Sequence, residues 1–158
     1  MNSLQMRLAD ARILALFSGS GALGLEALSR GAGTVAFVEE NPKAARIISE
    51  NAQSLGLLEH VDVFNRKVEQ MLPELISGPP FDFIFMDPPY DRGYEEKLLS
   101  SWPWSSLLTE GGLLCVESAY RKEGGHEPPA SLRITRDERY GDSQLTFYAR
   151  KEERTNPS

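Results

Sequence analysis

The chain has 158 residues, 41% of them hydrophobic and 25% charged, which suits one compact globular domain. The apolar runs are too short to cross a bilayer, residues 1–10 lack the apolar core of a signal peptide, and the single cysteine, Cys115, excludes an internal disulfide, so a cytoplasmic protein is expected. The net charge of −6 argues against a broad nucleic-acid surface, because Lys and Arg bind phosphate, although it leaves room for a local basic patch.

Strands and helices alternate over most of the chain. In chain order the predicted elements are strand 12–17, helix 20–30, strand 34–39, helix 42–55, strand 61–64, helix 68–76, strand 81–86, a partly helical segment at 94–108 and strand 112–117. Asn41 and Pro42 are typical of a helix start, and Pro103 must interrupt the segment that contains it. The alternation predicts an α/β fold with a mostly parallel, doubly wound sheet covered by helices on both faces.

The pattern changes after residue 118. Residues 119–130 are polar and rich in Gly and Pro, which indicates a loop. Strands are predicted at 131–137 and 144–150 with a turn at 140–142, and such neighbours form an antiparallel hairpin. A single domain over 1–150 is therefore expected, followed by a polar tail at 151–158.

A glycine-rich turn follows the first predicted strand, where ligands bind in doubly wound sheets. Its residues are Phe17, Ser18, Gly19, Ser20 and Gly21. With Gly24 the segment fits the pattern G-x-G-x-x-G, in which glycines permit a tight turn and close approach of a ligand to the backbone. Alone the pattern fits NAD, FAD, S-adenosylmethionine or mere packing.

Two acidic residues, Glu39 and Glu40, end the second predicted strand, about twenty residues after the glycines. A carboxylate at this place can accept hydrogen bonds from both hydroxyls of a ribose, whereas alone it would be an ordinary solvated acid. Together with the glycine turn it predicts a cofactor that contains ribose.

The fourth predicted strand ends in Asp87, Pro88, Pro89 and Tyr90. Consecutive prolines form a rigid extended turn, which fixes the direction of the Asp87 side chain and the Pro88 carbonyl. Two acceptors suit a planar amino group, and Tyr90 offers a face on which an unstacked base can lie. The alternative, a loop merely stiffened by prolines, leaves the acid and the aromatic ring unexplained.

These three motifs resemble the amino-methyltransferases of nucleic-acid bases, and within them the RsmD-type guanine-N2 methyltransferases of small-subunit ribosomal RNA. Residues 16–32 are very similar to that family's first motif, 37–39 to its second, 87–90 to its catalytic motif and 140–148 to its closing hairpin. Departures are Ala15 and Lys67, where the family usually has Asp, and the short stretch before the first strand, where it has a basic segment.

The resemblance implies a Rossmann-like class I methyltransferase with S-adenosylmethionine as cofactor. The cofactor would lie against residues 17–21, Glu39 and Glu40, with the backbone of Lys67 and Val68 beside its adenine. Asp87 and the Pro88 carbonyl would hold the guanine amino group and support catalysis, with the base against Pro89 and Tyr90. Ribosomal RNA in a small-subunit particle would be the partner of a monomeric enzyme.

Alternatives remain open at this point. The Asp-Pro-Pro-Tyr motif also suits adenine N6 or cytosine N4, and the departures at Ala15 and Lys67 allow a cofactor-binding module without catalysis. A nicotinamide-dependent oxidoreductase rests on the glycines alone. No metal site is expected, because His60 and His126 stand apart from other ligands. Basic residues in the last third form either an RNA-binding patch or a solvated face: Arg121, Lys122, Arg133, Arg136 and Arg139.

Overall fold

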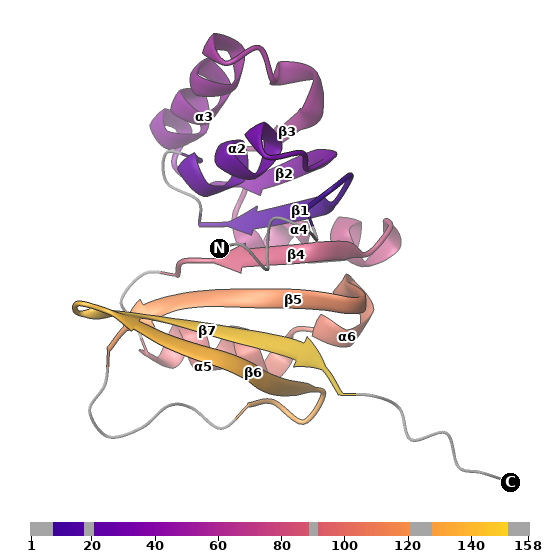
Figure 1. Ribbon diagram of the computed structural model, residues 1–158, viewed down its shortest axis with the longest axis vertical. Helices are drawn as coiled ribbons and strands as arrows, with labels where there is room; N and C mark the ends of the chain where they lie inside the picture. The colour runs from indigo at the N-terminus through magenta and orange to yellow at the C-terminus, as the bar shows by residue number, and fades with distance from the viewer. Residues whose placement is uncertain (1–7, 18–20, 89–91, 121–127, 152–158) are drawn as a thin grey trace, which may run out of the picture.

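The computed structural model describes residues 8–17, 21–88, 92–120 and 128–151 (Figure 1). In these residues seven strands form one sheet with the order β3-β2-β1-β4-β5-β7-β6. The strands are β1 (Arg12–Leu16), β2 (Thr34–Val38), β3 (Val61–Phe64), β4 (Phe81–Met86), β5 (Leu108–Ala119), β6 (Leu132–Tyr140) and β7 (Ser143–Arg150). The pairs among β1 to β5 are parallel, while β7 is antiparallel to β5 and β6 to β7, which confirms the predicted fold class.

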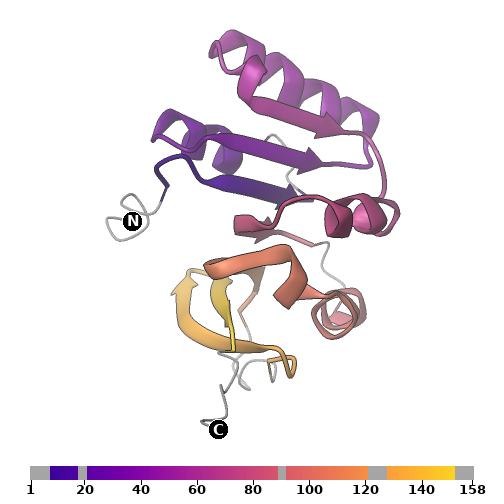
Figure 2. The same ribbon diagram turned by 90° about the vertical axis from the view of Figure 1, so that its right-hand side faces the viewer.

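Helices cover the sheet on both faces, as Figures 1 and 2 show. On one face α2 (Ala22–Ser29) and α3 (Pro42–Ser54) pack against the side chains of β1 and β2 that include Ile13 and Phe37. On the other face α4 (Val68–Ser77), α5 (Arg92–Ser101) and α6 (Trp104–Leu107) pack against the alternate side chains, such as Leu14. Central strands buried on both faces require continuous apolar runs, which explains the composition of β1 and β4.

The strand order determines at which point of the sheet a ligand site is expected. From β1 the chain builds outward through β2 to β3 and then returns to β4 on the other side of β1. The helices that follow these two strands, α2 after β1 and α5 after β4, therefore lie on opposite faces of the sheet, and a crevice lies between the carboxyl ends of β1 and β4. This is where doubly wound sheets bind ligands.

Element boundaries differ from the sequence prediction mainly at β5, which begins at Leu108 rather than at residue 112. Gly111 and Gly112 look like the end of a loop, but Leu108 already pairs with Phe81, and regular pairing resumes at Leu113. The intervening residues form an irregular stretch, in which Gly111 has φ of 80° and Thr109 donates a hydrogen bond to Asp82 (3.0 Å). The prediction also missed a short 3-10 helix, η1 (Leu58–His60).

The C-terminal hairpin is confirmed, with strands that extend beyond the predicted bounds to meet at Gly141 and Asp142. The amide of Lys151 donates to the carbonyl of Ser131 (3.0 Å), and the rest of the predicted polar tail lies outside the described residues. Within the described residues, no helix combines the length and the apolar character needed to cross a membrane.

Candidate functional site

Phe17 makes the turn after β1. Its φ of 57° lies in the left-handed region, which costs a residue with a side chain about 1–2 kcal/mol. The amide of Phe17 donates to the carbonyl of Val38 (3.2 Å), which holds the turn against β2. The backbone thereby leaves the sheet at the crevice. Ser18, Gly19 and Ser20 lie outside the described residues, so their predicted place beside a cofactor stays a prediction.

Gly21 and Gly24 allow α2 to begin close to the sheet. Gly21 caps α2 with φ of 77°, and a Cβ there would lie 3.1 Å from the Ile48 side chain. A Cβ on Gly24 would lie 2.6 Å from the buried ring of Phe37. The third glycine of the pattern is therefore needed for packing of the helix on the sheet, and the first turn of α2 comes to lie over the crevice.

Glu39 follows β2 and is held in place by its neighbours. Its Oε2 accepts a hydrogen bond from the amide of Asn41 (2.9 Å), while Asn41 caps α3 through its own side chain. The Asn65 side chain, which follows β3, donates to the carbonyls of Glu39 (2.9 Å) and Glu40 (3.0 Å). The Glu39 carboxylate is thus oriented, and within the described residues its Oε1 receives no hydrogen bond, so this atom can accept one from a ligand.

Lys67 and Val68 stand at the start of α4, after the carboxyl end of β3. Lys67 is the N-cap residue, and its amide donates to the side-chain oxygen of Gln70 (3.3 Å). The side chain of Lys67 is exposed, whereas Val68 is buried in the core. Because β2 and β3 are parallel neighbours, the start of α4 lies at the same edge of the sheet as Glu39, and the predicted contact of Lys67 and Val68 with a cofactor stays a prediction.

Asp87 follows β4 and lies next to the turn of β1. Its amide donates to the carbonyl of Leu16 (3.3 Å), which extends the pairing of β1 with β4 by one residue. Partial burial, followed by the negative charge of Glu117, raises the pKa of Asp87 above its usual value of 3.8. Pro88 is buried beside it, while Pro89 and Tyr90 lie outside the described residues.

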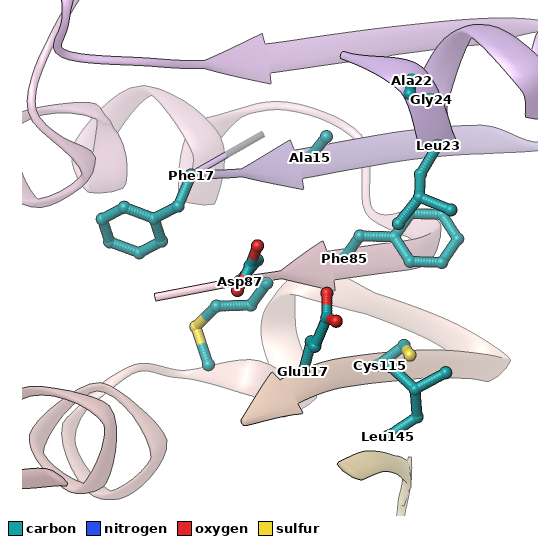
Figure 3. Close-up of a pocket in the computed structure, with 11 residues that line it drawn as sticks. Ala15, Phe17, Ala22, Leu23, Gly24, Phe85, Asp87, Cys115, Glu117 and Leu145 are labelled. Carbon is teal, nitrogen blue, oxygen red and sulfur yellow. The ribbon is translucent and has the colours of Figure 1, made fainter. Parts of the chain in front are cut away.

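A pocket lies at the carboxyl ends of β1, β4 and β5, on the face that carries α2 (Figure 3), and its lining does not include Glu39, Glu40, Lys67 or Val68. Its walls are apolar except for Asp87 and Glu117, whose carboxylates point into it. The lining residues include Phe17, Leu23, Phe85, Cys115 and Leu145. Burial raises the pKa of the Cys115 thiol to about 12, so this residue is a neutral wall group and not a nucleophile. A mostly apolar pocket with two convergent acids suits a flat ligand that offers hydrogen-bond donors.

Ala15 is one of the departures from the family pattern, and it also lines this pocket. It is buried, with 3% of its surface exposed, and a larger acid at this position would narrow the space between α2 and β4. The small side chain leaves that space open.

Tyr94 of α5 joins the site to its surroundings, although the sequence analysis did not single it out. Its ring makes an edge-to-face contact with Phe17 (centroids 5.6 Å apart), and its hydroxyl donates to the carboxylate of Glu69 in α4. Burial, helped by the hydrogen bond to Glu69, raises the pKa of Tyr94. Tyr94 thus ties α5 to the turn of β1 and to the start of α4.

The basic residues of the last third do not converge on one face. In the pairing of β6 with β7, Arg133 and Arg136 lie opposite Ala149 and Phe147, while Arg139 lies opposite Gln144, on the other face of the sheet. Arg136 forms an ion pair with Glu138, and the guanidinium of Arg139 lies 3.7 Å from the ring centroid of Tyr120. Arg121 and Lys122 lie outside the described residues. The three described arginines therefore favour a solvated edge over a single patch.

The fold and the sequence agree in the comparison with known proteins. A family model described as "Conserved hypothetical protein 95" matches residues 1–149. Ribosomal RNA small subunit methyltransferase D of Escherichia coli (strain K12) is 31% identical over 150 residues, which cover 95% of this chain and 74% of that protein.

Two solved structures are similar to this chain in both fold and sequence. A conserved hypothetical protein from Streptococcus pyogenes has a TM-score of 0.74 at 28% identity, with 90% of this chain and 88% of that chain covered. A hypothetical protein from Thermus thermophilus has a TM-score of 0.69 at 32% identity, with 92% and 78% covered. Because the match spans nearly the whole chain in both sequence and structure, the chain belongs to the family described as "Conserved hypothetical protein 95", the RsmD family that its motifs resemble.

Proposed function

We propose that this chain is an S-adenosylmethionine-dependent methyltransferase that methylates the N2 amino group of a guanine in small-subunit ribosomal RNA. The observation that carries the proposal is the position of Asp87, fixed by its hydrogen bond to Leu16 at the mouth of the pocket and directly beside the turn of β1. The 31% identity to an E. coli protein named ribosomal RNA small subunit methyltransferase D supports the substrate.

The residues present fit the proposed cofactor. Its ribose offers two hydroxyl donors, and the oriented Glu39 carboxylate offers Oε1 as an acceptor at the end of β2. The left-handed conformation of Phe17 turns the backbone out of the sheet. The close packing of Gly24 against Phe37 holds α2 near the sheet, beside the crevice. In the proposal, residues 17–21 hold the methionine portion, Glu39 and Glu40 border the ribose, and Lys67 and Val68 border the adenine.

When bound, S-adenosylmethionine supplies an electrophilic methyl carbon attached to a positively charged sulfur. The chain's own residues act on the acceptor nitrogen. The Asp87 carboxylate accepts one N2–H and the Pro88 carbonyl the other, which favours a pyramidal nitrogen with its lone pair free to react. The carboxylate also stabilises the positive charge that develops on this nitrogen, and the surplus proton leaves to Asp87 or to water. Tyr90 and Pro89 provide the surface against which the base is held.

Methyl-transfer assays test the proposal. Labelled S-adenosylmethionine would be incubated with the protein and small-subunit particles, naked ribosomal RNA or DNA, and the methylated nucleoside identified. We expect N2-methylguanosine in ribosomal RNA. Asp87→Ala should abolish transfer and leave the affinity for S-adenosylmethionine nearly unchanged, with NAD as the control ligand. Asp62→Ala, an exposed acid of β3, is the matched control.

Transfer by Asp87→Ala at the wild-type rate would contradict the role of Asp87. N6-methyladenosine or N4-methylcytosine as the product would replace the guanine target, and cofactor binding without transfer to any substrate would indicate a binding module.

The setting of this activity is part of the proposal. Residues 1–150 would act as one methyltransferase domain, followed by a polar tail at 151–158, in a cytoplasmic monomer that works on a small-subunit particle rather than on a membrane. Activity on particles that exceeds activity on naked RNA would support the particle as the substrate.

A further inference from the structure

Glu117 is an acid in the pocket to which neither the sequence motifs nor the proposed chemistry assigns a role. It follows Val116 of β5 just as Asp87 follows Met86 of β4, and Met86 and Val116 are register partners. Asp87 and Glu117 therefore occupy matching places on adjacent strands, which lie about 4.8 Å apart, and both face the pocket (Figure 3).

This second acid has no hydrogen-bond donor for its carboxylate among the residues that the structure describes. Glu117 is half-buried among apolar neighbours, with Leu145 as its register partner on β7 and Cys115 two residues before it on the same face. Within the described residues its carboxylate takes part in no hydrogen bond or ion pair, and its charge helps to raise the pKa of Asp87. Asp87 and Glu117 are therefore two neighbouring acceptors that both face the pocket, and a ligand can provide the donors that the pocket itself lacks.

The neighbouring carboxylates of Asp87 and Glu117 are complementary to a ligand with two adjacent hydrogen-bond donors. Guanine presents them on one edge, because its ring N1–H stands beside the N2 amino group. Adenine and cytosine instead carry an acceptor nitrogen beside their amino group, and a carboxylate would repel that lone pair. The apolar walls reduce competition from water and so strengthen such a hydrogen bond.

We propose that Glu117 accepts the N1–H of the target guanine and thereby selects guanine over bases with an unprotonated ring nitrogen at that edge. This inference rests on the proposed function, in which Asp87 holds the neighbouring amino group. Glu117 is a specificity residue in this arrangement, and it takes no part in the transfer itself.

The test exchanges the ring nitrogen of the substrate. After the wild-type protein has been used to map the methylated position, a synthetic segment with guanine or 2-aminopurine at that position is ligated into small-subunit ribosomal RNA. 2-Aminopurine keeps the amino group but has an acceptor at N1. For each protein, kcat/KM is measured on both substrates, and calorimetry gives the affinity for S-adenosylmethionine.

We expect Glu117→Gln to lower kcat/KM on guanine by about 10- to 100-fold, the effect of losing a charge-assisted hydrogen bond. On 2-aminopurine, kcat/KM of Glu117→Gln should fall less or rise, since the glutamine amide can donate to N1. The ratio of kcat/KM on guanine to that on 2-aminopurine should therefore fall by at least about tenfold. Cofactor affinity should not change. The matched control is Glu110→Gln, an exposed acid near the other end of β5. Because the preference is a ratio within one protein, partial unfolding of a variant cancels from it.

The outcomes separate the two proposals. If wild type methylates guanine and Glu117→Gln keeps the wild-type preference, the role of Glu117 is wrong and the proposed function stands. If the wild-type protein transfers no methyl group to any RNA, both the proposed function and the role of Glu117 are wrong. A reduced preference in Glu117→Gln together with an unchanged one in Glu110→Gln supports both.

Discussion

Replacing Gly24 by alanine would place a methyl group where the structure has no room for one. The new Cβ would lie 2.6 Å from Cε1 and Cζ of Phe37 and 3.0 Å from a methyl carbon of Val35. Both neighbours are fully enclosed, with exposed fractions of 0% for Phe37 and 1% for Val35, so neither can turn away into solvent. The first turns of α2 would have to rise from the sheet.

The magnitude follows from two opposing effects. Overpacking of a core costs about 1–3 kcal/mol, while alanine is more favourable than glycine inside a helix by about 1 kcal/mol. A net loss of about 1–2 kcal/mol is expected, and this lowers the midpoint of thermal unfolding by about 2–8 °C in a chain of this size. Thermal and urea unfolding of Gly24→Ala would measure it.

The control is Gly78→Ala, where the new Cβ would meet the carbonyl of Glu74 at 3.5 Å, an ordinary contact. Gly78 has φ of −93°, so this variant should be neutral or stabilised by about 0.5 kcal/mol. Shortening the opposing ring with Phe37→Leu should restore part of the stability of Gly24→Ala. If Gly24→Ala is as stable as the wild-type protein, Gly24 is not required for packing of α2 against Phe37, and contact with a ligand would explain the glycine instead.

Two further predictions concern the acids of the site. Glu39→Gln should weaken binding of S-adenosylmethionine by about 10-fold or more, because a charge-assisted hydrogen bond to the ribose is lost. Calorimetry measures this affinity. The control is Glu50→Gln, at an exposed acid of α3, which should bind the cofactor with wild-type affinity. Because Asp87 must be ionised to hold the amino group and its pKa is raised, transfer should fall on acidification at a pH above 3.8, and Glu117→Gln should shift this loss to lower pH. An unshifted pH profile in Glu117→Gln would contradict the coupling of the two acids.

The order of strands and helices could be predicted because the central strands β1, β2 and β4 are short, mostly apolar runs separated by helical segments. The irregular start of β5 could not be predicted from that pattern. Gly111 and Gly112 break the apolar run, and only the pairing of Leu108 with Phe81 shows that the strand has already begun. Contacts between distant residues decided that boundary, as they commonly do.

The positions of Glu39 and Asp87 directly after β2 and β4 could be predicted, because a local motif coincides with a strand end at each. Asn65 and Tyr94 could not be found in this way, because their partners Glu39 and Glu69 lie 26 and 25 residues away. Glu117 directly follows an apolar run, as Asp87 does, but β5 continues to Ala119 and no motif surrounds Glu117. Its position beside Asp87 depends on the register of β4 with β5, which the sequence does not give.

The pairing of β4 with β5 gives a physical reason for two acids in one pocket. A single carboxylate can accept from an amino group on any base, so Asp87 alone cannot choose among guanine, adenine and cytosine. Discrimination needs a second group that contacts the neighbouring ring nitrogen, and a polar group of the site that a wrong base leaves unpaired gives a large penalty against that base. In parallel strands in register, corresponding residues lie side by side, so one acid per strand places two acceptors next to each other in the pocket. The repulsion between Asp87 and Glu117 in the free protein would then be relieved by a base that brings two donors, and specificity would arise from the Glu117 charge that, after burial, raises the pKa of Asp87.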